Sequence, residues 1–265
     1  MSAVLAPVHA PGVVGRVNPV AKLGAAIVLS VALLLSIDWV SAGVALALEL
    51  VLLPFAGLSL RQLALRTLPL WIAAPSAVVA TMLYGRDDGG LLAQFWFVTV
   101  TEGSMSLAGA IGLRILAVGI PGIVLFATTD PTDLADGLAQ VLHLPARFVL
   151  GGLAGLRLVG LFVDDWRQLA LARRARGVAD AGGPWGALKR FGGQGFALLV
   201  LSVRRGSKLA TAMEAKGFGS DTPRTWARPS TWAGRDTVLV LVAVVVAAAS
   251  VTAAVLAGTW EFVLA

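Results

Sequence analysis

The stretch TVLVLVAVVVAAASVTAAVLAGTW, residues 237–260, decides the fold class of this chain. It contains no acidic or basic residue. A transmembrane helix needs about 20 predominantly apolar residues to cross the bilayer core. The stretch therefore predicts a membrane-spanning helix, and the rest of the sequence is interpreted as part of a membrane protein.

The composition of the whole chain agrees with this prediction. Its mean hydropathy is +0.84 and 14% of its residues are charged, whereas about a quarter are charged in a typical soluble domain. A length of 265 residues fits one polytopic membrane domain. The sequence has no cysteine and two histidines, His9 and His143, so we expect neither a disulfide framework nor a metal site. Residues 1–15 lack the layout of a signal peptide.

Four further segments are apolar enough to cross a membrane, and we expect an all-α integral membrane protein with about five transmembrane helices. The predicted spans cover residues 22–37, 41–60, 67–85, 105–128 and 236–260. The second contains Glu49 and the fourth contains Arg114, and charged residues inside a membrane are costly and usually paired. Glu49 is one candidate partner of Arg114. The alternative is that the Arg114 side chain extends to the membrane surface.

The charges between the spans predict the orientation, because cytoplasmic loops collect Lys and Arg. One side of the membrane, which includes the N-terminus, carries Arg16, Lys22, Arg61 and Arg66, and we expect this side to be cytoplasmic. The other side carries Asp38, Arg86, Asp87, Asp88 and Glu102, with Glu261 after the last span.

Residues 129–235, which we call the basic region, are expected to lie in the cytoplasm. They separate an N-terminal membrane part, residues 1–128, from the last helix within residues 236–265. The basic region carries 15 Lys and Arg residues against 8 Asp and Glu residues. One explanation is that these charges only follow the positive-inside rule and meet lipid headgroups. The other is that they bind a partner protein.

The basic region has the pattern of one short and two long amphipathic helices. Asp130 suits the N-cap of the short helix and Pro131 its first position, and the helix ends near His143. Each long helix ends at a glycine that suits a C-cap, Gly177 in the first and Gly217 in the second. We expect these helices to lie under or along the membrane domain.

The first long helix allows a second interpretation. Residues 148–163 are apolar enough for a sixth transmembrane span. The same segment holds small residues that permit close contact with another helix. They are Gly151, Gly152, Ala154, Gly155 and Gly160.

Two similar cassettes end the long helices and lie 40 positions apart. The first cassette is Arg173-Arg174-Ala175-Arg176-Gly177 and the second is Glu214-Ala215-Lys216-Gly217. An arginine fork can grip a carboxylate at two points, whereas a lysine offers a less directional point charge. Small neighbours let a partner protein enclose the basic group. The simpler interpretation is that each cassette is a helix C-cap with a base suited to the helix dipole.

Short segments along most of the chain carry a further signal. In the order of the sequence they are Asn18-Pro19-Val20-Ala21-Lys22-Leu23, Thr101-Glu102-Gly103, Leu113-Arg114-Ile115-Leu116, Thr128-Thr129-Asp130-Pro131-Thr132-Asp133-Leu134, Leu144-Pro145 and the two cassettes. Together they resemble the transmembrane T component of energy-coupling factor (ECF) transporters, the EcfT/CbiQ/BioN-like family. The coupling segments that begin at Thr128, in this order and spacing, are the specific part of the resemblance.

The resemblance implies a subunit of an ABC importer in a bacterial-type inner or plasma membrane. It would join two ABC ATPases to a substrate-binding membrane protein, the S component, for uptake of a vitamin or a metal ion, as in the cobalt, nickel and biotin systems. Both cassettes would dock on the ATPases through Arg176 and Lys216, and Lys216 replaces the arginine usual in the family. ATP would be bound by the partners, so this chain would need no cofactor.

Other functional classes fit the sequence less well. The alternative is a membrane subunit of another ABC importer or a stand-alone secondary carrier, but a carrier should show inverted repeats and polar residues on broken helices. The glycine-rich residues 192–195 lack the Lys-Ser/Thr of a phosphate-binding loop. No nucleophile and base stand together as in an enzyme. We therefore expect no catalytic residue, no metal site and no nucleic-acid partner for this chain.

Overall fold

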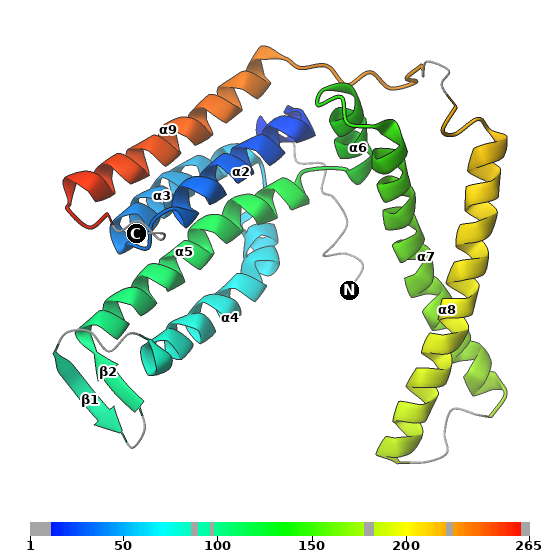
Figure 1. Ribbon diagram of the computed structural model, residues 1–265, viewed down its shortest axis with the longest axis horizontal. Coiled ribbons are helices and arrows are strands. Elements are labelled where there is room, and N and C mark those ends of the chain that lie inside the picture. The colour runs from blue at the N-terminus through cyan, green and yellow to red at the C-terminus, as the bar shows by residue number, and fades with distance from the viewer. Residues whose placement is uncertain (1–11, 86–89, 96–97, 178–182, 221–224, 261–265) are drawn as a thin grey trace. The chain divides into compact units, whose positions relative to one another are not determined.

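A computed structural model of the chain describes residues 12–85, 90–95, 98–177, 183–220 and 225–260 (Figure 1). Most of these residues are in helices, which confirms the all-α membrane class. Four charged residues used to predict the orientation, Arg86, Asp87, Asp88 and Glu261, lie outside the described residues.

The elements follow one another along the chain as helices with a single hairpin among the described residues. They are η1 (Val14–Arg16), α2 (Pro19–Leu34), α3 (Trp39–Leu52), η2 (Leu53–Ala56), α4 (Leu60–Tyr84), β1 (Leu91–Phe95), β2 (Val98–Thr101), α5 (Glu102–Ala127), α6 (Pro131–Gln140), α7 (Ala146–Ala175), α8 (Pro184–Ala215) and α9 (Gly234–Leu256).

Five helical segments of the described chain are long and apolar enough to cross a membrane. Four of them, α3 with η2, α4, α5 and α9, correspond to predicted spans. The fifth is α7, for which the sequence favours a cytoplasmic position and allows a span. The first predicted span appears as α2, which is apolar but 16 residues long and therefore short for a bilayer core. The number of spans stays a prediction.

The chain divides into two compact units. Unit 1 contains the residues up to Gly137 and those from Ser230 onward, and unit 2 contains Leu138–Pro229. Unit 1 therefore holds α2 to α5, α9 and the first part of α6. Unit 2 holds α7 and α8.

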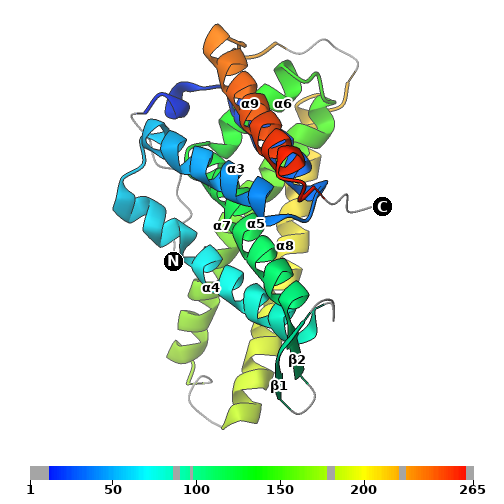
Figure 2. The same ribbon diagram turned by 90° about the vertical axis from the view of Figure 1, so that its left-hand side faces the viewer.

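Small residues form the core of unit 1. Helix α5 packs against α2, α3 and α4, and α9 packs against α2 and α3 (Figures 1 and 2). One core cluster consists of Ala25, Leu29, Ala243, Val246 and Ala247, and a second of Leu33, Ala45 and Ala117. Alanine is frequent here because lipid offers no hydrophobic drive for helix association, so helices gain by close packing.

Two glycines on α5 set its distance from α4. A Cβ atom on Gly112 would lie 2.5 Å from Cγ2 of Val78, and one on Gly119 would lie 2.6 Å from the methyl carbons of Leu70. Both gaps are too short for real atoms. The absent side chains therefore make room for Val78 and Leu70 of α4.

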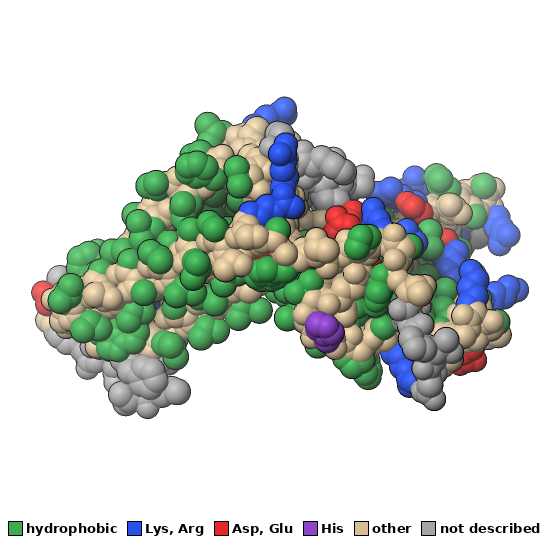
Figure 3. All heavy atoms as spheres, turned by 90° about the horizontal axis from the view of Figure 1, so that it is seen from above, with side chains coloured by type: hydrophobic (Ala, Val, Ile, Leu, Met, Phe, Trp, Pro, Cys, Tyr) green, Lys and Arg blue, Asp and Glu red, His purple; other side chains and the backbone are tan. Residues whose placement is uncertain are grey.

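The outer surface of unit 1 is apolar. Figure 3 shows hydrophobic side chains over much of its visible face. Exposed leucines, valines and isoleucines occur on α2, α3, α4 and α9. Such a surface needs lipid or protein to cover it.

The hairpin of β1 and β2 was not predicted. The strands are antiparallel, with Phe95 opposite Val98, and they precede α5, whose first turn is capped by Thr101 and Ser104. A short apolar run such as Leu91–Phe95 cannot be assigned to strand or helix by its periodicity. That ambiguity explains why the sequence did not reveal the hairpin.

Candidate functional site

The second cassette has a well-defined helix end. The backbone N–H of Gly217 donates to the Glu214 carbonyl and that of Phe218 to the Met213 carbonyl, both at 2.9 Å. Gly217 has a φ of 76°. This pair of bonds with a left-handed residue is the Schellman motif, so the predicted C-cap is confirmed.

The first cassette ends its helix in the same way. Gly177 has a φ of 69°, and its N–H donates to the Arg174 carbonyl at 2.9 Å. The residue before the glycine has nearly the same backbone angles in the two cassettes, φ −88° and ψ 6° for Arg176 and φ −89° and ψ 11° for Lys216. The two basic residues therefore occupy equivalent positions on two helix ends.

The outer part of each cassette is exposed. Arg174, Ala175, Arg176 and Gly177 are exposed in the first cassette, as are Glu214, Ala215, Lys216 and Gly217 in the second. Among the described residues, no hydrogen bond or salt bridge is formed by the side chains of Arg174, Arg176 or Lys216. These bases are free to contact another molecule.

Arg173 is different, because its guanidinium is used within the chain. It donates to the carbonyl oxygens of Arg190 at 3.2 Å and Gly193 at 2.8 Å, both on α8. A Cβ atom on Gly193 would lie 3.4 Å from the guanidinium nitrogens, so this glycine leaves room for the contact. The sequence groups Arg173 with the docking residues, and the structure gives it a position between the two helices.

Helices α7 and α8 are joined by further polar and aromatic contacts (Figures 1 and 2). The Trp166 and Phe191 rings meet edge to face at 5.1 Å. The Gln194 amide donates to the Trp166 carbonyl at 2.6 Å. Arg205 binds both carboxylate oxygens of Asp165, at 2.5 and 3.3 Å. These pairs could not be predicted from the sequence, since only folding brings their positions together.

Another arginine holds the turn behind the second cassette. Arg147, in the first turn of α7, donates to the Gly219 carbonyl at 3.0 Å. Arg173 near the end of α7 contacts the first part of α8, and Arg147 at the start of α7 contacts the chain just after α8. The two arginines thus hold both ends of the helix pair.

The predicted contact role of the α7 glycines is not realised within the described chain. Cβ atoms on Gly151, Gly152, Gly155 and Gly160 would meet no atom within 4 Å. The contacts with α8 come from other positions on α7. These glycines lie on open surface.

Unit 1 contains a buried polar junction at the start of α2. The Asp236 carboxylate accepts the backbone N–H groups of Asn18 at 2.8 Å and Ala233 at 2.6 Å. The Asn18 amide donates to the Ser230 hydroxyl at 3.0 Å. Asp236 is 1% exposed, so its charge is balanced by these donors and not by water.

Lys22 extends this junction to the end of α5. Its amino group donates to the Thr128 carbonyl at 2.8 Å and the Thr128 hydroxyl at 3.3 Å. Two residues later, Asp130 accepts the Thr132 N–H at 2.7 Å, as the predicted N-cap of α6 requires. The segments that begin at Asn18 and Thr128, which are distant in the sequence, therefore meet in space.

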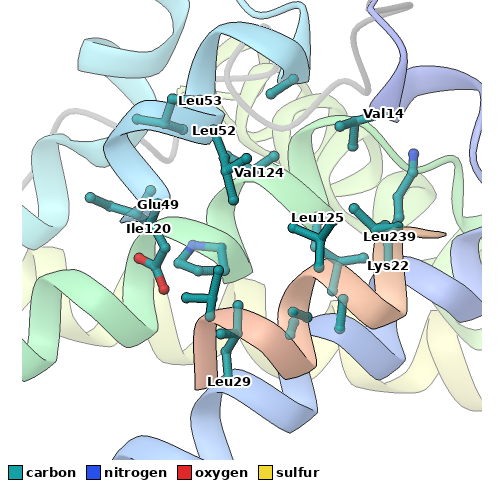
Figure 4. A pocket seen from close by; sticks show the side chains of 17 residues that line it. Val14, Lys22, Leu29, Glu49, Leu52, Leu53, Ile120, Val124, Leu125 and Leu239 are labelled. Atoms are coloured by element: carbon teal, nitrogen blue, oxygen red, sulfur yellow. The ribbon is translucent and has the colours of Figure 1, made fainter. Parts of the chain in front are cut away.

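Glu49 and Arg114 do not form a pair. Glu49 lies beside Ile120 and Pro121 of α5 (Figure 4), about two helical turns beyond Arg114. Helical side chains lean toward the N-terminus, so Arg114 leans away from Glu49. Among the described residues, neither carboxyl oxygen of Glu49 has a hydrogen-bond partner, and the same holds for Nε and Nη2 of Arg114. The proposed Glu49–Arg114 pair is therefore wrong.

Within the described ranges, no group of three or more His, Asp or Glu side chains could hold a metal ion.

Comparison with known proteins identifies relatives along nearly the whole chain. The family model described as cobalt transport protein (CbiQ) matches residues 12–225. A protein of Bacillus selenitireducens named energy-coupling factor transporter transmembrane protein EcfT is 28% identical over 255 residues, which cover 91% of this chain and 93% of that protein.

Two further proteins with the same name show comparable similarity. The one from Lactococcus lactis subsp. cremoris is 28% identical over 250 residues, covering 88% of this chain and 91% of its own length. The one from Bacillus subtilis is 30% identical over 169 residues, covering 61% of this chain and 64% of its own length. These matches confirm the resemblance drawn from the short motifs.

Proposed function

Because this chain belongs to the CbiQ family of cobalt transport proteins, we propose that it is the membrane subunit that couples ATP hydrolysis by the ATPases of an ECF-type importer to uptake. Its relatives are transmembrane proteins of energy-coupling factor transporters. In this proposal it joins two cytosolic ABC ATPases to a separate membrane protein, the S component, which binds the substrate. The chain itself catalyses no reaction.

The observation that carries the proposal is the equivalence of the two helix ends. Arg176 and Lys216 have the same backbone conformation, each precedes a left-handed glycine, and both are exposed. A C-cap explains each glycine separately. It does not require an exposed base at the same position on both helices, whereas docking on two similar partners does.

The chemistry of docking follows from the exposed groups. Each base would enter an acidic groove on an ATPase, and the flanking Ala and Gly residues would let the groove close around it. The fork of Arg176 allows two parallel hydrogen bonds to a carboxylate, and Lys216 provides a point charge. Movement of the ATPases would then displace the two helix ends.

The contacts between α7 and α8 support the transmission of such a movement. The Asp165–Arg205 pair, the Trp166–Phe191 contact and the Arg173 bonds join the two helices at separate levels. A displacement of one helix end is then shared by both helices. Without these contacts, each helix would move independently.

The substrate belongs to the S component in this proposal. A vitamin or a metal ion such as cobalt is the substrate class suggested by the family. We further propose that the N-terminus and the cassettes lie on the cytoplasmic side of the membrane, which is supported by the excess of Lys and Arg in residues 129–235.

Arginine-to-alanine substitution in the first cassette tests the docking. Arg176→Ala should weaken assembly with the ATPases and uncouple ATP hydrolysis from uptake, because truncating a buried charged contact at an interface costs about 2–5 kcal/mol. Lys216→Ala should have a smaller effect, and Lys216→Arg should be tolerated or strengthen assembly. Pull-down of the ATPases from membranes, together with uptake by whole cells, measures these effects.

Lys189→Ala and Arg204→Ala are the matched controls, because both side chains are exposed on α8 outside the cassettes. They should leave assembly and uptake unchanged at equal amounts of protein in the membrane. If all of these variants behave alike, the cassettes only follow the positive-inside rule. Uptake of substrate by this chain alone would point instead to a stand-alone carrier.

A further inference from the structure

The two cassettes carry opposite charges at one equivalent position. Arg174 in the first cassette and Glu214 in the second each lie two residues before the basic residue at the C-cap. The carbonyl oxygen of each accepts the N–H of the cap glycine at 2.9 Å. Because the two C-caps also have nearly the same backbone angles, the Arg174 and Glu214 side chains start from equivalent places on the two helix ends.

Neither of these side chains is occupied within the chain. Both residues are exposed, and among the described residues neither side chain forms a hydrogen bond or an ion pair. The residues one helical turn before Glu214 are Ala210 and Thr211, which carry no charge that could pair with it. Both charged groups are therefore available to a partner protein.

Helix stability explains Arg174 but does not explain Glu214. The carbonyl groups at the C-terminus of a helix carry a partial negative charge, so a base in the last turn is favourable and an acid is unfavourable. Helix α7 has Arg173 and Arg174 in its last turn, whereas α8 has no base there and carries Glu214. The acid at the end of α8 therefore needs another reason, and it lies beside the proposed docking residue Lys216.

The opposite charges make different demands on a docking groove. An acidic residue of the groove that faces Arg174 would attract the first cassette, and the same residue would repel Glu214 of the second. A basic residue at that place would have the opposite effect. Interfaces use such like-charge repulsion to exclude the wrong partner. Two copies of one groove therefore cannot suit both cassettes equally.

We propose that Arg174 and Glu214 determine which groove each cassette enters. This inference rests on the docking proposed above and adds the chemistry of the two grooves. The groove of the first cassette carries an acidic residue that faces Arg174, next to the carboxylate that binds Arg176. The groove of the second cassette carries a lysine or an arginine that faces Glu214, next to the carboxylate that binds Lys216. The C-cap bases provide the main attraction, and the two flanking charges provide the selectivity.

The alternative is a single kind of groove that accepts both cassettes. Arg174 and Glu214 would then point into water in the complex, and their charges would have no effect on assembly. In the proposed arrangement they lie at the edge of the interface, where charges act on the rate of association and on its dependence on salt. Charge reversal therefore distinguishes the two arrangements.

Charge reversal is tested with the full chain in nanodiscs and the ATPases that co-purify with it from its own membranes. Arg174→Glu and Glu214→Arg should each weaken binding of the ATPases roughly fivefold, the ratio given by a charge pair at an exposed edge. High salt should reduce both losses, because it screens the repulsion. Arg204→Glu and Asp164→Arg make the same changes of charge at exposed positions of α8 and α7 outside the cassettes and should leave binding unchanged.

Cross-linking identifies the groove that each cassette enters. The sequence has no cysteine, so Leu171→Cys and Thr211→Cys each place a single thiol at an exposed position. Each lies three residues before the selective charge, on the same helix face. With a photoreactive thiol reagent, the two variants should cross-link to different ATPase peptides. Combining Arg174→Glu with Glu214→Arg keeps the net charge and should shift each cross-link toward the peptides of the other groove.

Two results would overturn the selectivity and leave the docking in place. One is cross-linking of Leu171→Cys and Thr211→Cys to the same ATPase peptides, and the other is unchanged binding in both charge reversals. Absence of any cross-link to an ATPase from both positions would overturn the docking as well. The apparent melting temperature checks that each variant is folded. If a reversed variant does not fold, Arg174→Gln and Glu214→Gln remove the same charges, and unchanged binding in both would also overturn the selectivity.

Discussion

Gly112 shows how one absent side chain sets the spacing of two transmembrane helices. Cγ2 of Val78 lies 2.5 Å from the position that a Cβ atom of residue 112 would take, which is too close for both atoms. Valine is β-branched and has little rotameric freedom in a helix, so it cannot move aside easily. The close packing of α4 and α5 therefore depends on this glycine.

We expect Gly112→Ala to destabilise unit 1 by about 1–3 kcal/mol, the usual range for overpacking. The apparent melting temperature in detergent measures the effect. Adding Val78→Ala should restore much of the loss, since it removes the clashing methyl group. Gly109→Ala is the control, because open space surrounds that position and alanine favours a helix over glycine by about 0.5–1 kcal/mol. Equal melting temperatures for Gly112→Ala and Gly109→Ala would show that α4 and α5 pack differently.

At the scale of the element, the two ion pairs of α7 differ in what they connect. Asp165 and Arg205 join α7 to α8, and their side chains are 17% and 40% exposed. Asp164 and Arg167 both belong to α7, lie 3.7 Å apart and are about 60% exposed. Exposed pairs contribute little because water and salt screen them.

A double-mutant cycle should therefore find a coupling between Asp165 and Arg205 and none between Asp164 and Arg167. Alanine substitutions, singly and together, with the melting temperature as the readout, complete each cycle. The α7–α8 coupling should be of the order of 1 kcal/mol, since the pair is bidentate but partly exposed. A coupling of the same size in both cycles would mean that the pair does not hold the two helices together.

The sequence predicted the elements better than their contacts. The ends of α7 and α8 were predictable because glycine is the residue that most readily adopts the left-handed conformation of a C-cap. The partners of Asp236, Arg173 and Arg205 were not, because they lie on different helices and no local pattern records the pairing. For the same reason Glu49 and Arg114 looked like partners in the sequence, although Glu49, on α3, lies beside a part of α5 that is about two turns beyond Arg114.

At the scale of the whole molecule, the junction around Asp236 joins α2 to α9. Asp236→Asn should destabilise unit 1 by about 1–3 kcal/mol, because the amide nitrogen would face a backbone N–H and leave one donor unpaired. The melting temperature measures this loss. Asp164→Asn is the exposed control and should have little effect. No difference between the two variants would mean that water replaces the lost acceptor.

The same junction has a consequence for the modular construction of the protein. A Cβ atom on Gly137 would lie 3.6 Å from the Ser230 hydroxyl, so the chain leaves unit 1 and returns to it at nearly one place. Within unit 2, the Gln140 amide donates a hydrogen bond to the Arg228 carbonyl at 2.9 Å. The first and last residues of this unit therefore also lie close together. Segments with adjacent ends are those that domain insertion and excision tolerate.

Unit 2 should therefore be removable as a block. A chain in which a short Gly-Ser linker replaces residues 138–229 should still insert into membranes and show cooperative thermal unfolding, while it should lose the proposed binding of ATPases. Excision of residues 60–84, which would remove α4 from the core of unit 1, is the control and should prevent folding. The helices of unit 1 would then fold without α7 and α8, and replacing residues 138–229 alone would be enough to change the partner that the protein binds.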